Sequence, residues 1–90
     1  MASSSYTFCG LESWYKHEFE HFGWMVLAHQ NPEQKQKVQM YHDSIVHLMN
    51  AIQEKINLLK NEDNKNDLTI MWKELSILLQ SVRTLFQISA

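Results

Sequence analysis

The chain has 90 residues, of which 44% are hydrophobic and 20% are charged, with 2 glycines and 1 proline. This length allows one domain with a small core, and the composition excludes a disordered tail, a collagen-like chain and a turn-rich β-sandwich. Lys and Arg number 8 and Asp and Glu number 10, so the net charge is −2, and the basic residues are scattered. Nucleic acid and membranes are therefore not expected partners, because both require clustered positive charge.

The cysteine content and the first residues bear on the compartment. Cys9 is the only cysteine and cannot form an internal disulfide, which favours a reducing compartment for so small a domain. The start of the chain, MASSSY, has neither a basic residue nor an apolar stretch, so a secretion signal is not expected. No apolar run approaches the roughly 18 residues that a membrane-spanning helix needs. We therefore expect a protein that is not secreted.

Residues 1–9 are Ser-rich and are predicted to form a flexible arm, followed by a helical domain over residues 10–90. A first helix is expected over about residues 11–29, where apolar side chains recur at helical spacing. Gly23 falls inside this helix and indicates close helix packing or a slight bend. The apolar face of this helix comprises Leu11, Trp14, Tyr15, Phe22, Met25 and Val26.

A second helix is expected over residues 32–60, after a break in the apolar pattern at residues 30–34. Asn31 suits the N-cap position, Pro32 suits the first helical position, and Gln34 completes a capping box. Apolar residues then recur with the heptad spacing of helices that pack lengthwise. They are Val38, Tyr41, Ile45, Leu48, Met49, Ile52, Ile56 and Leu59.

A third helix is expected over residues 64–88, with Asn64 as its N-cap and Asp67 in its first turn. Because both connections are short, neighbouring helices must be antiparallel, and no segment alternates as a strand does. The sequence therefore predicts an all-α, up-down-up three-helix bundle, with the first helix packed against a long hairpin of the second and third. The third apolar stripe comprises Leu68, Met71, Trp72, Leu75, Leu78, Leu79, Val82, Leu85 and Phe86.

Several apolar residues fall outside these stripes, and a small monomer should not leave a large apolar patch in water. Single exposed apolar residues are common, but tryptophan and methionine are typical anchors of protein interfaces. We therefore predict a protein–protein surface used for self-association or for docking onto a larger assembly. Its residues are Phe19, Trp24 and Leu27 on the first helix and Ile70, Ile77 and Ile88 on the third.

The densest polar cluster, residues 17–21, reads His-Glu-x-x-His, the helical pattern of zinc proteases. The longer zinc-ligand pattern is not completed, because Gly23 and His29 fall at the wrong offsets. Glu18 and His21 also match one Glu-x-x-His pair of a di-iron bundle, and a homodimer would supply a second pair. A metal-binding bundle built on Glu18 and His21 is therefore the alternative function.

Glu18 lies in the middle of the apolar face of the first helix, where an unpaired charge is costly. Counting residues across the two connections brings four polar side chains to one level of the bundle. Arg83 would supply the positive charge that a metal ion would otherwise bring, so the layer is interpreted as structural. The predicted buried polar layer comprises Glu18, His21, His42 and Arg83.

Neither a Gly-rich phosphate loop nor a nucleophile elbow occurs in the chain. We therefore assign no catalytic residue, no cofactor and no metal in the preferred interpretation, and expect a non-enzymatic protein.

Residues 14–28, WYKHEFEHFGWMVLA, and residues 67–72, DLTIMW, form distinctive runs. Together they resemble a family of short helical proteins of giant DNA viruses of the nucleocytoplasmic group, over most of residues 11–85. The resemblance carries over no activity and no catalytic residue. It implies a viral protein made in the cytoplasm of the infected cell, with packaging in the virion as one setting. A homo-oligomer or a larger viral assembly is then the expected partner.

Overall fold

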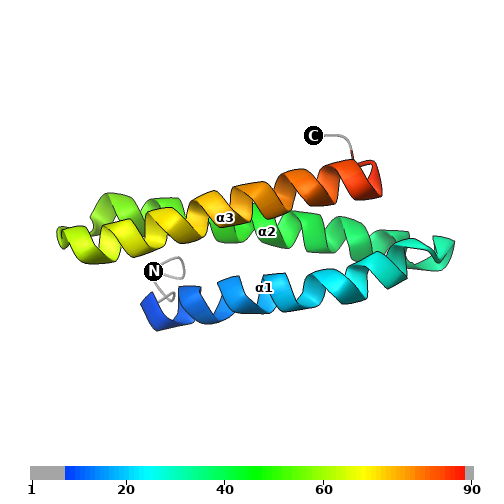
Figure 1. Cartoon of the computed structure of the whole chain (residues 1–90), viewed down its shortest axis with the longest axis horizontal. Helices are drawn as coiled ribbons and strands as arrows, with labels where there is room; N and C mark the ends of the chain where they lie inside the picture. The colour runs from blue at the N-terminus through cyan, green and yellow to red at the C-terminus, as the bar shows by residue number, and fades with distance from the viewer. Residues whose placement is uncertain (1–7, 89–90) are drawn as a thin grey trace.

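The computed structural model describes residues 8–88, with side chains from residue 10 onward. Its helices are α1 (Phe8–His29), the short 3₁₀ helix η2 (Pro32–Gln34), α2 (Lys35–Leu58) and α3 (Glu62–Phe86). The α-helices lie side by side, with α1 and α3 running in one direction and α2 in the other (Figure 1). α2 contacts both other helices, and residues 8–88 contain no strand. The predicted all-α, up-down-up three-helix bundle is confirmed.

The first helix begins earlier than predicted. Of the predicted arm, residues 1–7 lie outside the described part of the chain, whereas Phe8 and Cys9 already belong to α1. The helix ends at His29, the predicted position.

Gly23 lies within α1, where the sequence predicts close packing or a bend. The prediction of close packing is wrong, because Gly23 is exposed and an added Cβ would meet no neighbouring atom within 4 Å. Its φ is not positive, so an L-residue is tolerated without strain. Neither packing nor backbone conformation therefore requires a glycine here, and the residue lowers the helix propensity of α1.

We expect Gly23→Ala to raise the free energy of unfolding by about 0.5–1 kcal/mol, because alanine restricts the unfolded chain and favours the helix. Urea denaturation followed by circular dichroism measures this change. An unchanged or lower stability would show that α1 needs a glycine at this position.

The connection between α1 and α2 forms one of the two predicted capping interactions, the one made by the Asn31 side chain. The Asn31 side chain accepts a hydrogen bond from the Glu33 N–H (3.0 Å), and Pro32 begins a 3₁₀ turn before α2 starts at Lys35. Gln34 makes no side-chain cap bond, since the Asn31 N–H that it would bind donates to the Ala28 carbonyl instead. The reciprocal half of the predicted capping box is therefore not formed.

The connection between α2 and α3 has the predicted length of three residues but lies two residues earlier in the chain, at residues 59–61. α2 ends at Leu58, and Asn61 caps α3 by accepting hydrogen bonds from the Asp63 and Asn64 N–H groups (2.9 and 3.2 Å). The prediction of Asn64 as N-cap is wrong, because Asn61 places the acidic Glu62 and Asp63 in the first turn, where the helix dipole favours them.

The third helix ends at Phe86 rather than at residue 88. Gln87 adopts the left-handed conformation (φ 56°), and the Ile88 N–H donates to the Arg83 carbonyl (3.0 Å). The Gln87 N–H donates to the same Arg83 carbonyl, so this closure satisfies one carbonyl group at the end of the helix and turns the chain back over the end of the bundle.

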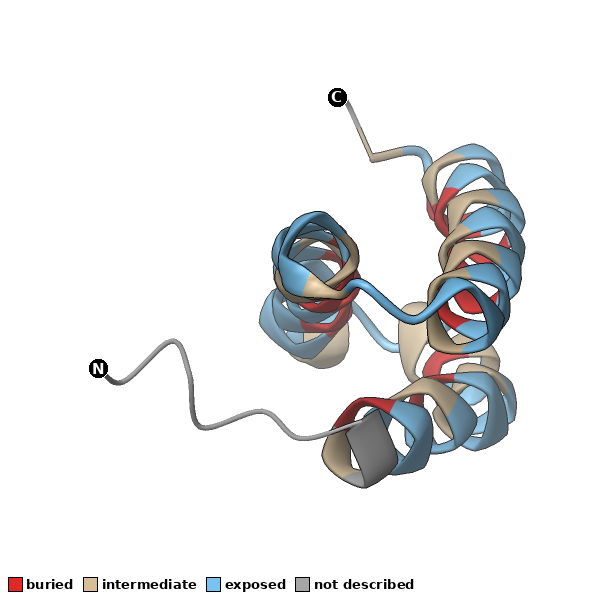
Figure 2. Ribbon diagram, turned by 90° about the vertical axis from the view of Figure 1, so that its left-hand side faces the viewer, coloured by how far each residue is buried: buried red, intermediate tan, exposed pale blue. Residues whose placement is uncertain are grey.

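The core is formed mainly by the facing apolar stripes of α2 and α3, and the buried parts of the helices lie on the sides that face one another (Figure 2). α1 contributes Leu11 and Met25 as fully buried apolar residues, whereas Tyr15, Phe22 and Val26 are half-buried. The buried apolar residues of the other two helices are Val38, Tyr41, Ile45, Leu48, Met49, Ile52, Leu68, Met71, Leu75, Leu78, Leu79, Val82 and Phe86.

Two residues that the sequence places in apolar stripes are exposed instead. Trp14 lies at the edge of α1 and borders a groove against α2. Leu85 lies at the edge of the α3 stripe and is 49% exposed. Both flank their stripes, so the neighbouring helix covers them only in part.

Candidate functional site

Most of the residues predicted to form an interaction surface are exposed on α1 and α3. Trp24 and Ile77 are 69% and 68% exposed, so the chain itself covers less than half of either residue. We name the exposed members the outer apolar set, which consists of Phe19, Trp24, Leu27, Ile70 and Ile77.

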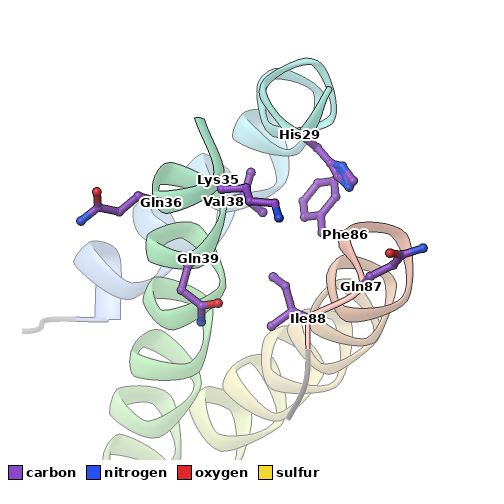
Figure 3. Close-up of a pocket in the computed structure, with 8 residues that line it drawn as sticks. All are labelled: His29, Lys35, Gln36, Val38, Gln39, Phe86, Gln87 and Ile88. Atoms are coloured by element: carbon purple, nitrogen blue, oxygen red, sulfur yellow. The ribbon is translucent and has the colours of Figure 1, made fainter. Parts of the chain in front are cut away.

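Ile88 does not share this exposure. It is half-buried against the core and lines a cavity of about 600 Å³ at the end of the bundle. Figure 3 shows the Ile88 side chain directed into this space, beside Phe86 and His29, whose ring centres lie 4.9 Å apart. The turn at Gln87 carries Ile88 away from the outer side of α3.

The outer apolar set does not form a single patch. The Phe19 ring contacts Tyr15 (5.1 Å between ring centres), and the Tyr15 hydroxyl donates a hydrogen bond to the Glu74 carboxylate on α3. Phe19 therefore lies on the side of α1 that faces α3. Trp24 is about 140° further round the helix, so one flat partner surface cannot cover both residues.

The outer side of α3 carries the longest run of exposed apolar residues. Ile70 and Ile77 are one heptad apart, and Ile77 and the exposed Leu85 both line a shallow groove of about 490 Å³. We name these three residues the α3 line.

Sequence reasoning missed Leu85 because it assigned this residue to the core stripe. It also omitted the exposed Met40 and Leu58 of α2, although both lie outside the predicted stripe, as Ile70 and Ile77 do.

Glu18 forms the first part of the predicted polar layer, between α1 and α2. The residue is 3% exposed, and its Oε2 atom has no hydrogen-bond partner among the described residues. Burial raises the pKa of the Glu18 carboxyl, and His17 and a hydrogen bond with Ser44 lower it in part. The Tyr41 hydroxyl donates to the backbone carbonyl of Glu18 (2.6 Å), not to its carboxylate. The carboxylate is thus buried and under-satisfied.

His42 and Arg83 form the second part, between α2 and α3. The Arg83 Nε–H donates to His42 Nε2 (3.1 Å), and His42 Nδ1 lies 3.0 Å from Asp43 Oδ1. Because a guanidinium only donates, Nε2 must be the acceptor, so the ring proton sits on Nδ1 and is donated to Asp43. This bond, together with one from Gln39, holds the pKa of the Asp43 carboxyl below its usual range.

The predicted single layer is therefore divided into two clusters. The prediction that Arg83 compensates Glu18 is wrong, because Arg83 donates to His42 on the other side of α2. The reason is rotational: consecutive residues on a helix are about 100° apart, so Tyr41 faces α1 while His42 faces α3. His21 is half-buried and contacts the Tyr41 ring (5.6 Å between ring centres) on the Glu18 side.

A groove of about 280 Å³ lies between α1 and α2, and Glu18 is one of the residues that line it. Trp14, His17 and His21 line its α1 side as a row of rings with neighbouring centres 5.5 and 5.4 Å apart. Among the described residues, no group of three or more His, Cys, Asp or Glu side chains is placed to hold a metal ion. The alternative of a site with Glu18 as a ligand therefore lacks a complete ligand set in this part of the chain.

Comparisons with protein-family models, with curated proteins and with solved structures each found no match. Within residues 8–88, no helix is both long enough and apolar enough to cross a lipid bilayer.

Proposed function

We propose that this chain is a non-enzymatic protein–protein interaction module that self-associates or docks onto a larger assembly through its outer apolar side chains. The observation that carries the proposal is the exposure of Ile70 and Ile77 on α3, whereas Leu68, Leu75 and Val82 of the same helix are 0% exposed. These isoleucines are thus surplus to the core of one chain.

The expected strength of the interaction follows from the area available. Covering the exposed part of one such side chain stabilises a complex by about 1–2 kcal/mol, so an interface formed by the three residues of the α3 line from each of two copies offers about 6–12 kcal/mol. Association costs about 4–15 kcal/mol in lost freedom of motion. We therefore expect weak self-association, in which the associated fraction of the chain is small at low concentration and increases over the micromolar range. A larger partner would add contacts and bind more tightly.

The cellular setting is also a proposal, supported by the resemblance of residues 14–28 and 67–72 to the giant-virus family. That resemblance favours the cytoplasm or the virion of an infected cell. A second copy of the chain or a larger viral protein assembly is the proposed partner, with no role for nucleic acid or membrane.

A double variant, Ile70→Glu with Ile77→Glu, tests the proposal by placing two charges on the α3 line. We expect the wild-type mass, measured by light scattering after size exclusion, to rise between about 1 and 100 µM. The double variant should stay monomeric, because charges in an apolar interface lose their hydration.

The matched control, Gln36→Glu with Asn50→Asp, adds the same charge at exposed positions on α2 and should associate like the wild type. A wild-type chain that stays monomeric throughout would refute self-association and leave docking onto another protein. Equal association of both double variants would show that the α3 line is not the interface.

A further inference from the structure

A pair of histidines on α1 faces the groove between α1 and α2. His17 and His21 are four residues apart, their ring centres are 5.4 Å apart, and their planes are inclined by 19°. His17 is exposed and His21 is half-buried, so both imidazoles are accessible from the groove.

The spacing of the two rings suits a shared metal ion. A zinc–nitrogen bond is about 2.0–2.1 Å, and a ring centre lies about 1.1 Å beyond the nitrogen, so two imidazoles at a tetrahedral angle have centres about 5 Å apart. The observed 5.4 Å is close to this value. The near-parallel planes require rotation about χ2, a torsion that is broad in histidine.

The groove also holds a negative charge without a full set of partners. Glu18 lies next to His17 in the chain and interacts with it electrostatically. Its Oε2 is buried and accepts no hydrogen bond in the described part of the molecule. A cation held by the two histidines would compensate this carboxylate. Lys37 is a cation lining the same groove, but its side chain is exposed, so its charge is largely screened by water.

We propose that His17 and His21 form a two-histidine site for a transition-metal ion such as Cu²⁺, Ni²⁺ or Zn²⁺, with Glu18 as the nearby counter-charge and water at the remaining positions. This inference is independent of the interaction surface and differs from a site with Glu18 as a direct ligand. Two protein ligands give modest affinity, in the order Cu²⁺ above Ni²⁺ and Zn²⁺.

Calorimetric titration of the full chain with ZnCl₂ alone tests the site whose spacing the tetrahedral geometry fits, and parallel titrations with NiCl₂ and CuCl₂ test the expected order of affinity. We expect one ion per chain, and a rise in the thermal midpoint with metal, because only the folded helix fixes the four-residue spacing. His17→Gln and His21→Gln should each weaken binding at least about tenfold, which corresponds to about 1.4 kcal/mol. Circular dichroism of both variants shows whether they fold.

His29→Gln is the matched control and should bind the metal like the wild type, because His29 lines the cavity at the end of the bundle and not the groove. Glu18→Gln should weaken binding less than either groove histidine variant, because it removes charge and not a ligand. Absence of binding, one ion per two chains, or equal binding by wild type and the His17 variant would overturn the proposal.

Discussion

Leu75→Ala is expected to lower the free energy of unfolding by about 2–5 kcal/mol, one of the largest effects of any single substitution in this bundle. Leu75 is 0% exposed in the stripe of α3 that packs on α2. Truncation removes buried methyl groups and leaves a cavity that the surrounding helices only partly fill. A domain of this size has a total stability of about 5–13 kcal/mol, so the variant loses a large share of it.

Leu85→Ala is the matched control, because it makes the same chemical change on the same helix at a half-exposed position. Its expected cost is about 1 kcal/mol or less when measured at a concentration where the chain is monomeric. Urea denaturation of both variants gives the comparison. Equal losses would contradict the assignment of Leu75 to the core and of Leu85 to the α3 line.

Glu18→Met is expected to raise the free energy of unfolding by about 1–3 kcal/mol at neutral pH, although it removes the residue at the centre of the buried polar cluster. Methionine has a similar length and carries no charge to desolvate. The Tyr41 hydroxyl keeps its acceptor, since that acceptor is the backbone carbonyl of residue 18. Ser44 is exposed and can bond to water instead.

The gain should depend on pH in a defined direction. The folded state raises the pKa of Glu18 above its ordinary value of 4.5, so the folded chain binds this proton more tightly than the unfolded chain does. Wild-type stability from this group therefore falls as pH rises from about 4.5 through the raised value. The advantage of Glu18→Met should be largest above that window and shrink below it.

Denaturation of wild type and variant at several pH values tests this expectation. Glu20→Met is the control, because Glu20 is exposed on the same helix and should show little effect at any pH. If Glu18→Met destabilised the bundle by several kcal/mol at neutral pH, the carboxylate would have a partner that compensates its charge.

The helices were predictable from sequence because heptad spacing and caps are local signals. The Asn31-Pro32 pair marked the first connection correctly, since proline fixes the backbone there. The start of α3 was less predictable, because Asn61 and Asn64 both suit an N-cap and the acidic residues after Asn61 decide between them. Leu85 shows a further limit: the width of an apolar stripe depends on how far the neighbouring helix covers it.

The candidate site was predictable along the bundle axis but not around it. Short connections and a fixed rise per residue bring Glu18 level with Tyr41, which the structure places in contact. The partner of Arg83 depends on rotation about α2, where one residue changes the direction by about 100°. The apolar residues outside the stripes were easier to identify. A residue opposite the core face of a helix remains exposed even when the helix is rotated slightly about its axis.

The most direct test of the central claim is methyl NMR of the isoleucines during dilution of the full chain from about 100 µM to about 1 µM. Ile70 and Ile77 are exposed on one chain, whereas Ile45 and Ile52 are fully buried and serve as internal controls. We predict that the signals of Ile70 and Ile77 shift with concentration while those of Ile45 and Ile52 stay fixed. If all four signals are unchanged, the exposed isoleucines do not mediate self-association.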